Sequence, residues 1–304
     1  MTADPVLTLN DLAAWSRPGV SLAVLGHPIR HSVSPAMHNA ALGGLAREDA
    51  RFADWRYFKF EVPPDDLLRA LDLLHRGGFH GVNLTVPHKV LAFGRMAEVD
   101  PAARPAGAVN TLLRRPEGWA GFNTDGYGLA AAVRETLGRE LTGAPIVLLG
   151  AGGAARGAAV ECLQRRCASL TIVNRTRENL DALLALLKPL AGGIHVAGLD
   201  PVDITARAPA GALIINATSA GLKASDPLPV DLAALRAPAA VFDMIYNPPE
   251  TALLRAAAGR GIPSANGLAM LVHQGAKALE IWSGAPAGRT ATVMAAAARN
   301  ALGI

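Results

Sequence analysis

The chain of 304 residues has few aromatic residues and no concentrated charge. Aromatics make up 5% of the chain and hydrophobic residues 51%, so the core must consist mainly of alanine, leucine and valine. The formal net charge is +4, yet no run of basic residues reaches three. Nucleic-acid binders cluster their positive charge, so that class is disfavoured. A basic pocket for an anionic small molecule fits this composition better.

Cysteine is also scarce. Cys162 and Cys167 are five residues apart in a predicted helix, a spacing that matches neither a metal site nor a redox pair. So few cysteines indicate a reducing compartment. The N-terminal stretch lacks a basic segment followed by an apolar core, which predicts no signal peptide, and no apolar run reaches membrane-spanning length. We therefore expect a soluble, cytoplasmic protein that binds neither nucleic acid nor a membrane.

Strand and helix patterns alternate along the first half, which predicts an α/β fold. Residues 21–26 are typical of a strand, and a helix follows with Ser34 as its N-cap and Pro35 at its first position. Residues 65–78 form an amphipathic pattern that ends at two glycines. A second strand is predicted at 81–86.

The alternation restarts in the second half, after a connecting helix predicted at 127–137. The predicted strands lie in 144–150, 169–175, 212–221 and 239–248, and predicted helices follow the first two of them, at 152–166 and 179–190. The final helices begin near residue 268. The pattern alone leaves open whether they cover the second half or return to the first.

A glycine-rich loop, "GAGGAARG" at 150–157, joins a predicted strand to a predicted helix. Gly150 permits a tight turn, while Gly152 and Gly153 let backbone amides approach a pyrophosphate at the helix N-terminus. A glycine-rich loop alone also occurs in ordinary turns. Here the complete strand–loop–helix–strand context favours a dinucleotide site.

The end of the next predicted strand indicates which dinucleotide is bound. NAD sites carry an acidic residue about 20 residues after the glycine loop, where it binds the ribose 2′-hydroxyl. This chain instead has Asn174, Arg175, Thr176 and Arg177, with no acidic residue before Glu178. Guanidinium groups suit a 2′-phosphate, which predicts NADP. The alternative for one of the two arginines is a solvated loop residue with no role in binding.

The predicted strand 81–86 leads directly into polar residues. Asn83 and Thr85 lie on one face of that strand, Pro87 ends it, and Lys89 follows. Polar groups at strand ends are where α/β enzymes hold their catalytic residues. A solvated loop lysine is the alternative for Lys89 taken by itself.

Nine motifs in order resemble the shikimate dehydrogenase family, which reduces 3-dehydroshikimate to shikimate with NADPH. They are "HSVSPAMHN", "NLTVPHK", "GAVNT", "GFNTDG", "GAGGAARG", "NRT", "NATSAG", "DMIYNP" and "GLAMLVHQ", and the resemblance spans roughly residues 22 to 282. Quinate/shikimate dehydrogenases share most of these motifs, so the resemblance fixes the substrate less tightly than the family.

The resemblance implies two α/β domains. Residues 1–126 and 268–304 would form a substrate-binding domain, with the C-terminal helices returning to it, and residues 127–267 would form a Rossmann-like NADP-binding domain. It also implies shikimate or 3-dehydroshikimate as the small-molecule partner. The assembly would be a monomer or a homodimer.

Site residues follow from the same resemblance. Lys89 and Asp125 would be the catalytic pair. The substrate ligands would be Ser32, Ser34, Thr85, Lys89, Asn110, Asp125, Tyr246 and Gln274. The cofactor ligands would be Gly150, Ala151, Gly152, Gly153, Ala154, Asn174, Arg175, Thr176, Arg177, Met244 and Gly267. No metal is implied.

One position departs from the family. Asn266 stands where many members carry aspartate, which puts a charge-based role there in doubt.

Two rival interpretations remain open. One is a quinate/shikimate dehydrogenase that uses NAD, which the missing acidic residue before Glu178 disfavours. The other is a non-catalytic NADP sensor on the same fold. The presence of both Lys89 and Asp125 disfavours a sensor, which would be free to lose either residue.

Overall fold

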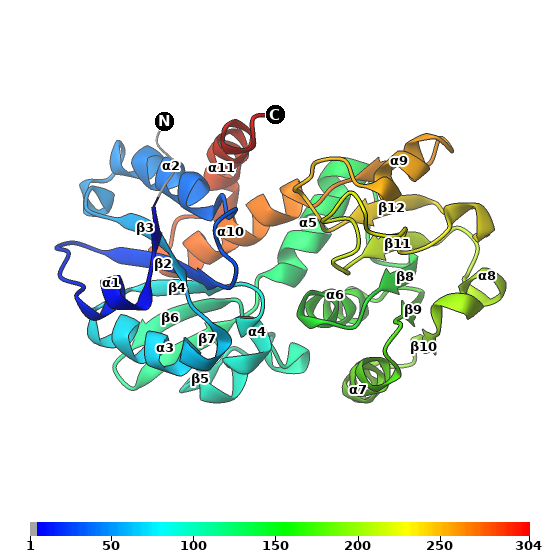
Figure 1. Ribbon diagram of the computed structural model, residues 1–304, viewed down its shortest axis with the longest axis horizontal. Helices are drawn as coiled ribbons and strands as arrows, with labels where there is room; N and C mark the ends of the chain where they lie inside the picture. Colours follow the sequence, from blue (N-terminus) through cyan, green and yellow to red (C-terminus); the bar gives the residue numbers. More distant parts are fainter. Residues whose placement is uncertain (1–4) are drawn as a thin grey trace. The chain divides into compact units, whose positions relative to one another are not determined.

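The computed structural model describes residues 5–304 and divides the chain into two compact units (Figure 1). The first unit contains the chain up to Thr124 together with Val272–Ile304, and the second is Asp125–Leu271. Each unit is built on its own sheet. The predicted α/β class is therefore confirmed.

The first unit holds a mixed sheet of seven strands, in the order β1-β3-β2-β4-β6-β7-β5. Its strands are β1 (Val6–Leu7), β2 (Ser21–Gly26), β3 (Arg56–Glu61), β4 (Gly81–Leu84), β5 (Glu98–Val99), β6 (Thr111–Arg115) and β7 (Gly118–Phe122). Strands β1 to β4 pair in parallel, whereas β6 pairs antiparallel with both β4 and β7. Strand β6 thus runs against the direction of the other strands in the sheet.

Helices cover both faces of this sheet (Figure 1). They are α1 (Leu9–Ala13), α2 (Ser34–Ala46), α3 (Leu67–Arg76), α4 (His88–Leu91), α10 (Leu268–Ser283), which begins in the second unit, and α11 (Ala287–Leu302). Alternate strand residues face opposite sides, so Phe60 and Val82 join the apolar core with α3 while Tyr57 stacks on His38 of α2. Helix α11 packs against α2, which confirms that the C-terminal helices return to the first unit.

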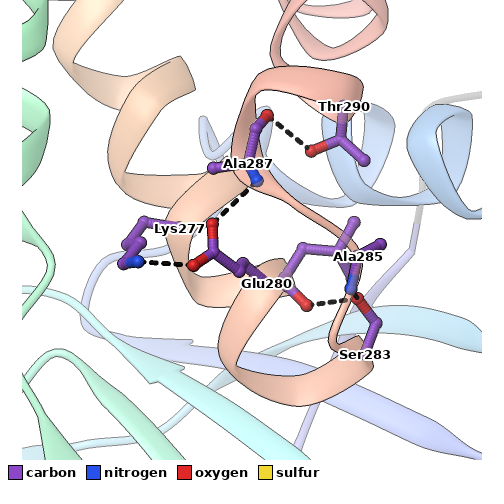
Figure 2. Close-up of polar contacts among 7 residues, drawn as sticks. Lys277, Glu280, Ser283, Ala285, Ala287 and Thr290 are labelled. Atoms are coloured by element: carbon purple, nitrogen blue, oxygen red, sulfur yellow. Dashed lines mark hydrogen bonds and ion pairs between the residues drawn. The ribbon is translucent and has the colours of Figure 1, made fainter.

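The turn between α10 and α11 is held by side chains that bond the two helix ends (Figure 2). The Glu280 carboxylate accepts the backbone N–H of Ala287, at the start of α11, at 2.8 Å and pairs with Lys277. The Ser283 hydroxyl donates to the Leu279 carbonyl and accepts the N–H of Ala285 at 3.0 Å. These bonds satisfy backbone groups that a helix end leaves unpaired.

The second unit holds six parallel strands in the order β10-β9-β8-β11-β12-β13. The strands are β8 (Pro145–Leu149), β9 (Ser169–Val173), β10 (His195–Leu199), β11 (Leu213–Asn216), β12 (Ala240–Asp243) and β13 (Ser264–Ala265). The helices are α5 (Asp125–Leu137), α6 (Gly153–Gln164), α7 (Arg177–Leu187), α8 (Ile204–Arg207) and α9 (Ala252–Ala258). Numbered along the chain, this is the 3-2-1-4-5-6 order of dinucleotide-binding sheets.

Three local predictions are wrong. Ser34 is the first helical residue, and the N-cap is Val33. The hydroxyl that accepts a backbone N–H at this helix start is that of Ser32, which bonds the Ser34 N–H. Strand β4 ends at Leu84, before Thr85 and Val86, because the chain turns there and the His88 N–H donates to the Thr85 carbonyl at 2.8 Å. Cys167 lies beyond the end of α6, after Arg166, whose φ is +58°.

Both cysteines are buried and unpaired, as core-filling residues would be. None of the helices in the described part of the chain combines the length and apolar composition needed to cross a bilayer.

His38 is a fully buried imidazole in the first unit. Within residues 5–304, neither of its ring nitrogens has a hydrogen-bond partner. The ring stacks on Tyr57, with centroids 4.1 Å apart and planes 1° from parallel. Burial lowers the pKa of His38 from 6.5 to about 3, so the folded protein keeps it neutral.

We predict that His38 makes the first unit acid-sensitive. The unfolded chain takes up a proton near pH 6.5 and the folded one only near pH 3, so stability falls by about 1.4 kcal/mol per pH unit across that window. His38→Phe keeps an aromatic stack without the titration. Between pH 7.5 and pH 5 it should lose about 2 kcal/mol less stability than the unsubstituted protein.

Urea titrations followed by tryptophan fluorescence measure this effect, because all four tryptophans (Trp15, Trp55, Trp119 and Trp282) lie in the first unit. The same pH dependence in both proteins would mean that folded His38 accepts a proton.

Candidate active site

The residues predicted to bind substrate in the first unit gather at one edge of its sheet. Parallel strands β2 and β4 end at this edge with Gly26 and Leu84. Strand β6 begins there, because its antiparallel register places Thr111 opposite Asn83 of β4. Strand β7 ends there, with Phe122 opposite Thr111. Segments from four strands therefore meet at one edge.

Ser32 and Ser34 lie at the N-terminus of α2. The half-buried Ser32 hydroxyl accepts the Ser34 N–H at 3.3 Å, and Ser34 opens the 13-residue helix. The aligned peptide dipoles of a helix favour negative charge at this end. Two hydroxyls at such a position suit the substrate carboxylate that they are predicted to bind.

Thr85 follows β4 and packs against the end of β2. Its N–H donates to the Leu25 carbonyl at 2.9 Å, and the N–H of His27 donates to the Val86 carbonyl at 3.1 Å. A Cβ atom on Gly26 would lie 2.5 Å from Cγ2 of Thr85. Glycine is therefore required at 26 for the Thr85 side chain to lie where it does.

Lys89 lies in the short helix α4, which is anchored on both sides. The buried His88 Nε2–H donates to the Val62 carbonyl at 2.9 Å, and the Lys89 carbonyl accepts the Val109 N–H at 2.9 Å. Burial lowers the pKa of His88, partly offset by the bond to Val62, and nearby His27 lowers it further. A neutral His88 thus fixes the turn that carries the half-buried Lys89.

Asn110 and Gln274 are brought together in the first unit. The buried Asn110 Oδ1 accepts the Thr124 N–H at 2.8 Å. Its Nδ2 donates to Thr124 Oγ1 at 3.0 Å and to Gln274 Oε1 at 3.4 Å. Residues 164 positions apart in the sequence therefore share one hydrogen-bonded cluster.

Two residues of this cluster, Tyr57 and Thr111, were given no role from the sequence. Asn83, which the sequence places on the same strand face as Thr85, bonds the Asn110 carbonyl. Tyr57 and Thr111 belong to the same chain of bonds. The available signal was the position of these polar side chains inside strands with otherwise apolar neighbours.

In the second unit, the glycine loop connects β8 to α6. Gly150 has a φ of +109°, and a Cβ there would lie 3.1 Å from the Ala217 carbonyl oxygen. Gly152 is the N-cap of α6 in an extended conformation, and a Cβ there would meet no atom within 4 Å. Helix α6 begins without a side-chain cap. The first turn of α6, including Gly153 and Ala154, therefore fits an anionic pyrophosphate.

The two arginines after β9 differ in their surroundings. Arg177 begins α7 and pairs with Asp181 at 3.0 Å; the hydrogen bond to Asp181 is the main cause of its raised pKa. Arg175 is exposed, and within residues 5–304 it has no ion-pair partner. Asn174 donates to the Thr176 carbonyl at 2.8 Å, which shapes the turn between them. Of the two predicted 2′-phosphate ligands, Arg175 is therefore the one whose guanidinium is not engaged by a carboxylate of the described residues.

Met244 and Gly267 lie side by side at the end of β12. The Gly267 N–H donates to the Ile245 carbonyl at 3.0 Å, and a Cβ on Gly267 would overlap the Met244 carbonyl oxygen. Buried Asp243 accepts bonds from Thr251 at 2.6 Å and from Asn216 of β11 at 2.9 Å. These bonds fix the turn that carries Met244.

Two further residues near this turn were singled out by the sequence. Burial raises the pKa of Tyr246, so its hydroxyl stays protonated. Asn266 accepts the N–H of Leu268 at the start of α10 and donates its amide to the Pro249 carbonyl at 2.9 Å. A carboxylate cannot make the second bond, which explains asparagine at this position.

The catalytic pair is divided between the units. Lys89 belongs to the first, and buried Asp125 opens α5 in the second. Their pairing stays a prediction. Among residues 5–304 no group of three or more His, Cys, Asp or Glu side chains has the arrangement of a metal site.

Family models match at both ends of the chain. Residues 24–112 match a shikimate dehydrogenase substrate binding domain, and residues 267–299 match a shikimate 5'-dehydrogenase C-terminal domain. A shikimate dehydrogenase (NADP(+)) from Symbiobacterium thermophilum is 42% identical over 272 residues, which are 88% of this chain and 90% of the relative. The chain belongs to the shikimate dehydrogenase family.

Solved structures of this family share the fold. The shikimate 5-dehydrogenase of Thermus thermophilus, in complex with NADP(H) and shikimate, is 35% identical with a TM-score of 0.79, over 93% of this chain and all of that one. A 5-ketofructose reductase of Gluconobacter is 30% identical with a TM-score of 0.76, over 94% and 99%. The shikimate dehydrogenase fold thus also carries an enzyme named for another ketone.

The two glycines of the loop should respond differently to an added methyl group. Gly150→Ala forces a positive φ and a tight contact with Ala217, so it should destabilise the second unit by about 1–3 kcal/mol. Gly152→Ala meets neither obstacle and should change stability by less than about 1 kcal/mol. Urea unfolding followed by circular dichroism compares them. Equal losses would mean that the loop geometry described here is wrong.

Proposed function

We propose that the chain is an NADP-dependent shikimate dehydrogenase, which reduces 3-dehydroshikimate reversibly to shikimate. The observation that carries the proposal is similarity along nearly the whole length of relatives bearing that name. The position at one sheet edge of those predicted substrate ligands that belong to the first unit supports it. The reaction belongs to aromatic amino acid biosynthesis.

NADP would be held in the second unit. The first turn of α6 from Gly152 would take the pyrophosphate, Arg175 the 2′-phosphate, and Met244 with Gly267 the nicotinamide end. The bound cofactor supplies a hydride to the carbonyl carbon in the reducing direction. The residues of the chain bind, orient and protonate the substrate.

Lys89 would donate a proton to the oxygen that becomes a hydroxyl. Its ammonium charge stabilises the developing alkoxide before the proton moves. Asp125 would keep the lysine oriented and hold an adjacent substrate hydroxyl. In the oxidising direction the same lysine, as the neutral amine, takes the proton back.

The substrate itself would lie along the first unit's sheet edge. Ser32 and Ser34 would hold its carboxylate at the N-terminus of α2, while Thr85, Asn110, Tyr246 and Gln274 would hold the ring hydroxyls or the carboxylate. The domain division at 1–126, 127–267 and 268–304, a cytoplasmic location, and a monomer or homodimer complete the proposal.

An absorbance assay at the NADPH band tests the proposed function. Shikimate and quinate are each paired with NADP and with NAD. The pair of shikimate and NADP should give the highest kcat/KM. Turnover of quinate alone, or no turnover with any pair, would contradict the proposal.

Lys89→Ala should lower turnover by about 10²–10⁴-fold, because it removes both the charge and the proton donor. Asp125→Asn should also be severe, and the double variant should lose little more than the worse single one, since the pair acts as a unit. Steady-state kinetics with circular dichroism measure this. Exposed Lys188→Ala is the control, and Lys89→Ala within threefold of that control would end the assignment.

Arg175→Gln should weaken NADP binding by about 10–100-fold, the effect of losing one charge-assisted contact, and leave NAD binding within about twofold. Arg177→Gln is the matched control and should have the smaller effect, because Arg177 is already paired with Asp181. Fluorescence titrations with NADP and with NAD measure the affinity of each variant for both dinucleotides. Equal weakening of NADP and NAD by Arg175→Gln would contradict the 2′-phosphate role.

A further inference from the structure

A continuous chain of hydrogen bonds starts at Tyr57, in the interior of the first unit. Tyr57 is buried in β3, and its hydroxyl donates to Asn83 Oδ1 at 2.7 Å. Asn83 Nδ2 then donates to the Asn110 carbonyl and to Thr111 Oγ1, both at 3.0 Å. All four residues are almost inaccessible to solvent. Removing one partner from a buried network of this kind leaves the other unsatisfied and lowers the free energy of unfolding.

The chain continues to the predicted substrate ligands. Thr111 Oγ1 donates to Asn110 Oδ1 at 3.0 Å. Asn110 Nδ2 donates to Gln274 Oε1 at 3.4 Å. The Asn110 side chain is thus reached from Tyr57 through Asn83 and Thr111, and it lies next to the Gln274 amide.

Two backbone groups fix the direction of every bond in this chain. The Asn110 carbonyl can only accept, so Asn83 must turn its Nδ2 toward it and its Oδ1 toward Tyr57. The Thr124 N–H can only donate, so Asn110 must turn its Oδ1 toward it and its Nδ2 toward Gln274. Gln274 therefore turns its oxygen to Asn110 and its NH₂ group away. In the proposed function, a Gln274 amide oriented in this way would hold the substrate.

Tyr57 is the donor on which the Asn83 end of the chain depends. Within residues 5–304, the Tyr57 hydroxyl is the donor whose hydrogen bond Asn83 Oδ1 accepts. The Tyr57 ring is held face to face by His38, and its backbone N–H and carbonyl are both bonded by Asn39, at 2.9 and 3.0 Å. Burial raises the pKa of Tyr57, so the hydroxyl keeps its proton at every working pH.

We infer that Tyr57 is a positioning residue that acts through Asn83 and Thr111 to hold Asn110 and Gln274 in their substrate-binding orientation. The inference rests on the proposed function, which places these two amides on the substrate. Tyr57 itself touches no substrate in this assignment. Without its hydroxyl, Asn83 keeps a buried oxygen with no donor, and the side chain must shift at the expense of its bonds to Asn110 and Thr111.

Tyr57→Phe tests the inference, because it removes only the hydroxyl. It should lower kcat/KM for shikimate by about 5–30-fold, mainly through KM, and leave KM for NADP within about twofold. Thr111→Val breaks the next link, suits a strand and should reproduce this split even where Tyr57→Phe fails to fold. In a Gln274→Ala background each change should cost a smaller factor than in the unsubstituted protein, since one of the two positioned amides is gone.

Ser283→Ala is the matched control for a purely structural effect. It too deletes one buried hydroxyl of the first unit and leaves one buried group, the Ala285 N–H, without its partner (Figure 2). It should lower the melting temperature comparably and change kcat/KM by less than about twofold. A Tyr57→Phe protein that behaves like Ser283→Ala, or that loses the same factor in the Gln274→Ala background, overturns the inference.

A second measurement does not require turnover. With ¹⁵N-labelled asparagine and glutamine, the side-chain NH₂ signals of Asn83, Asn110 and Gln274 should move or broaden in Tyr57→Phe and stay in place in Ser283→Ala. Unchanged Asn110 and Gln274 signals overturn the inference whatever the enzyme turns over. If the unsubstituted protein is inactive but the signals change in Tyr57→Phe, the result contradicts only the proposed function.

Discussion

The antiparallel pairing of β6 with β4 is the constraint on which the first unit's site depends. In a purely parallel sheet, every strand would bring its carboxyl end to the same edge. Because β6 runs the other way, its beginning lies there, opposite Asn83, and the returning β7 brings Thr124 back to the same edge. The Asn110 carbonyl thereby comes within reach of the Asn83 side chain of β4, and the Thr124 N–H within reach of the Asn110 side chain. The chain entering and leaving the hairpin supplies the fixed backbone groups, and β4 supplies a side chain that uses one of them.

Burying so many amides and hydroxyls beneath a site is favourable only when each finds a partner. An unpaired buried polar group costs about 1–3 kcal/mol, which exceeds the net gain of one hydrogen bond. The cluster meets this condition by ending on backbone groups of fixed polarity, so that a flipped amide at Asn83 or Asn110 would lose bonds at both ends. A network of this kind selects one arrangement more strongly than apolar packing does, because apolar packing tolerates small rotations. Pre-organised donors also reduce the entropy lost when a ligand binds.

Much of the fold was predictable from the sequence, and the reason lies in local signals. The buried strand before "GAGGAARG", the glycines and the following helix appear together in the sequence, because a phosphate loop needs all of them within about ten residues. Only the family resemblance predicted that the C-terminal helices return to the first unit. The apolar face of α11 would suit packing against either unit, and in the structure it packs against α2. Tyr57 and Thr111 were missed because each bonds Asn83 across a long sequence separation, 26 residues for Tyr57 and 28 for Thr111. Asn266 shows a third case, in which a departure from the family motif becomes intelligible only once Pro249 is known to lie beside it.

In the proposed function, the two units would present fixed donors to a ligand by different physical means. In the second unit the proposed pyrophosphate donors are backbone amides at the start of α6, for which the sequence need only supply glycines that leave the backbone accessible. In the first unit the proposed donors are side chains, whose freedom must be removed by other side chains. The aromatic residues are also divided unevenly: all four tryptophans lie in the first unit, whereas the mostly aliphatic core of the second contains Phe242. Large rigid rings such as Tyr57 and Trp282 can carry a polar atom into a core at low entropic cost, as their bonds to Asn83 and to the Leu112 carbonyl illustrate. Such rings therefore lie where buried side chains must be held in one orientation, whereas the backbone amides at the start of α6 are held by the helix itself.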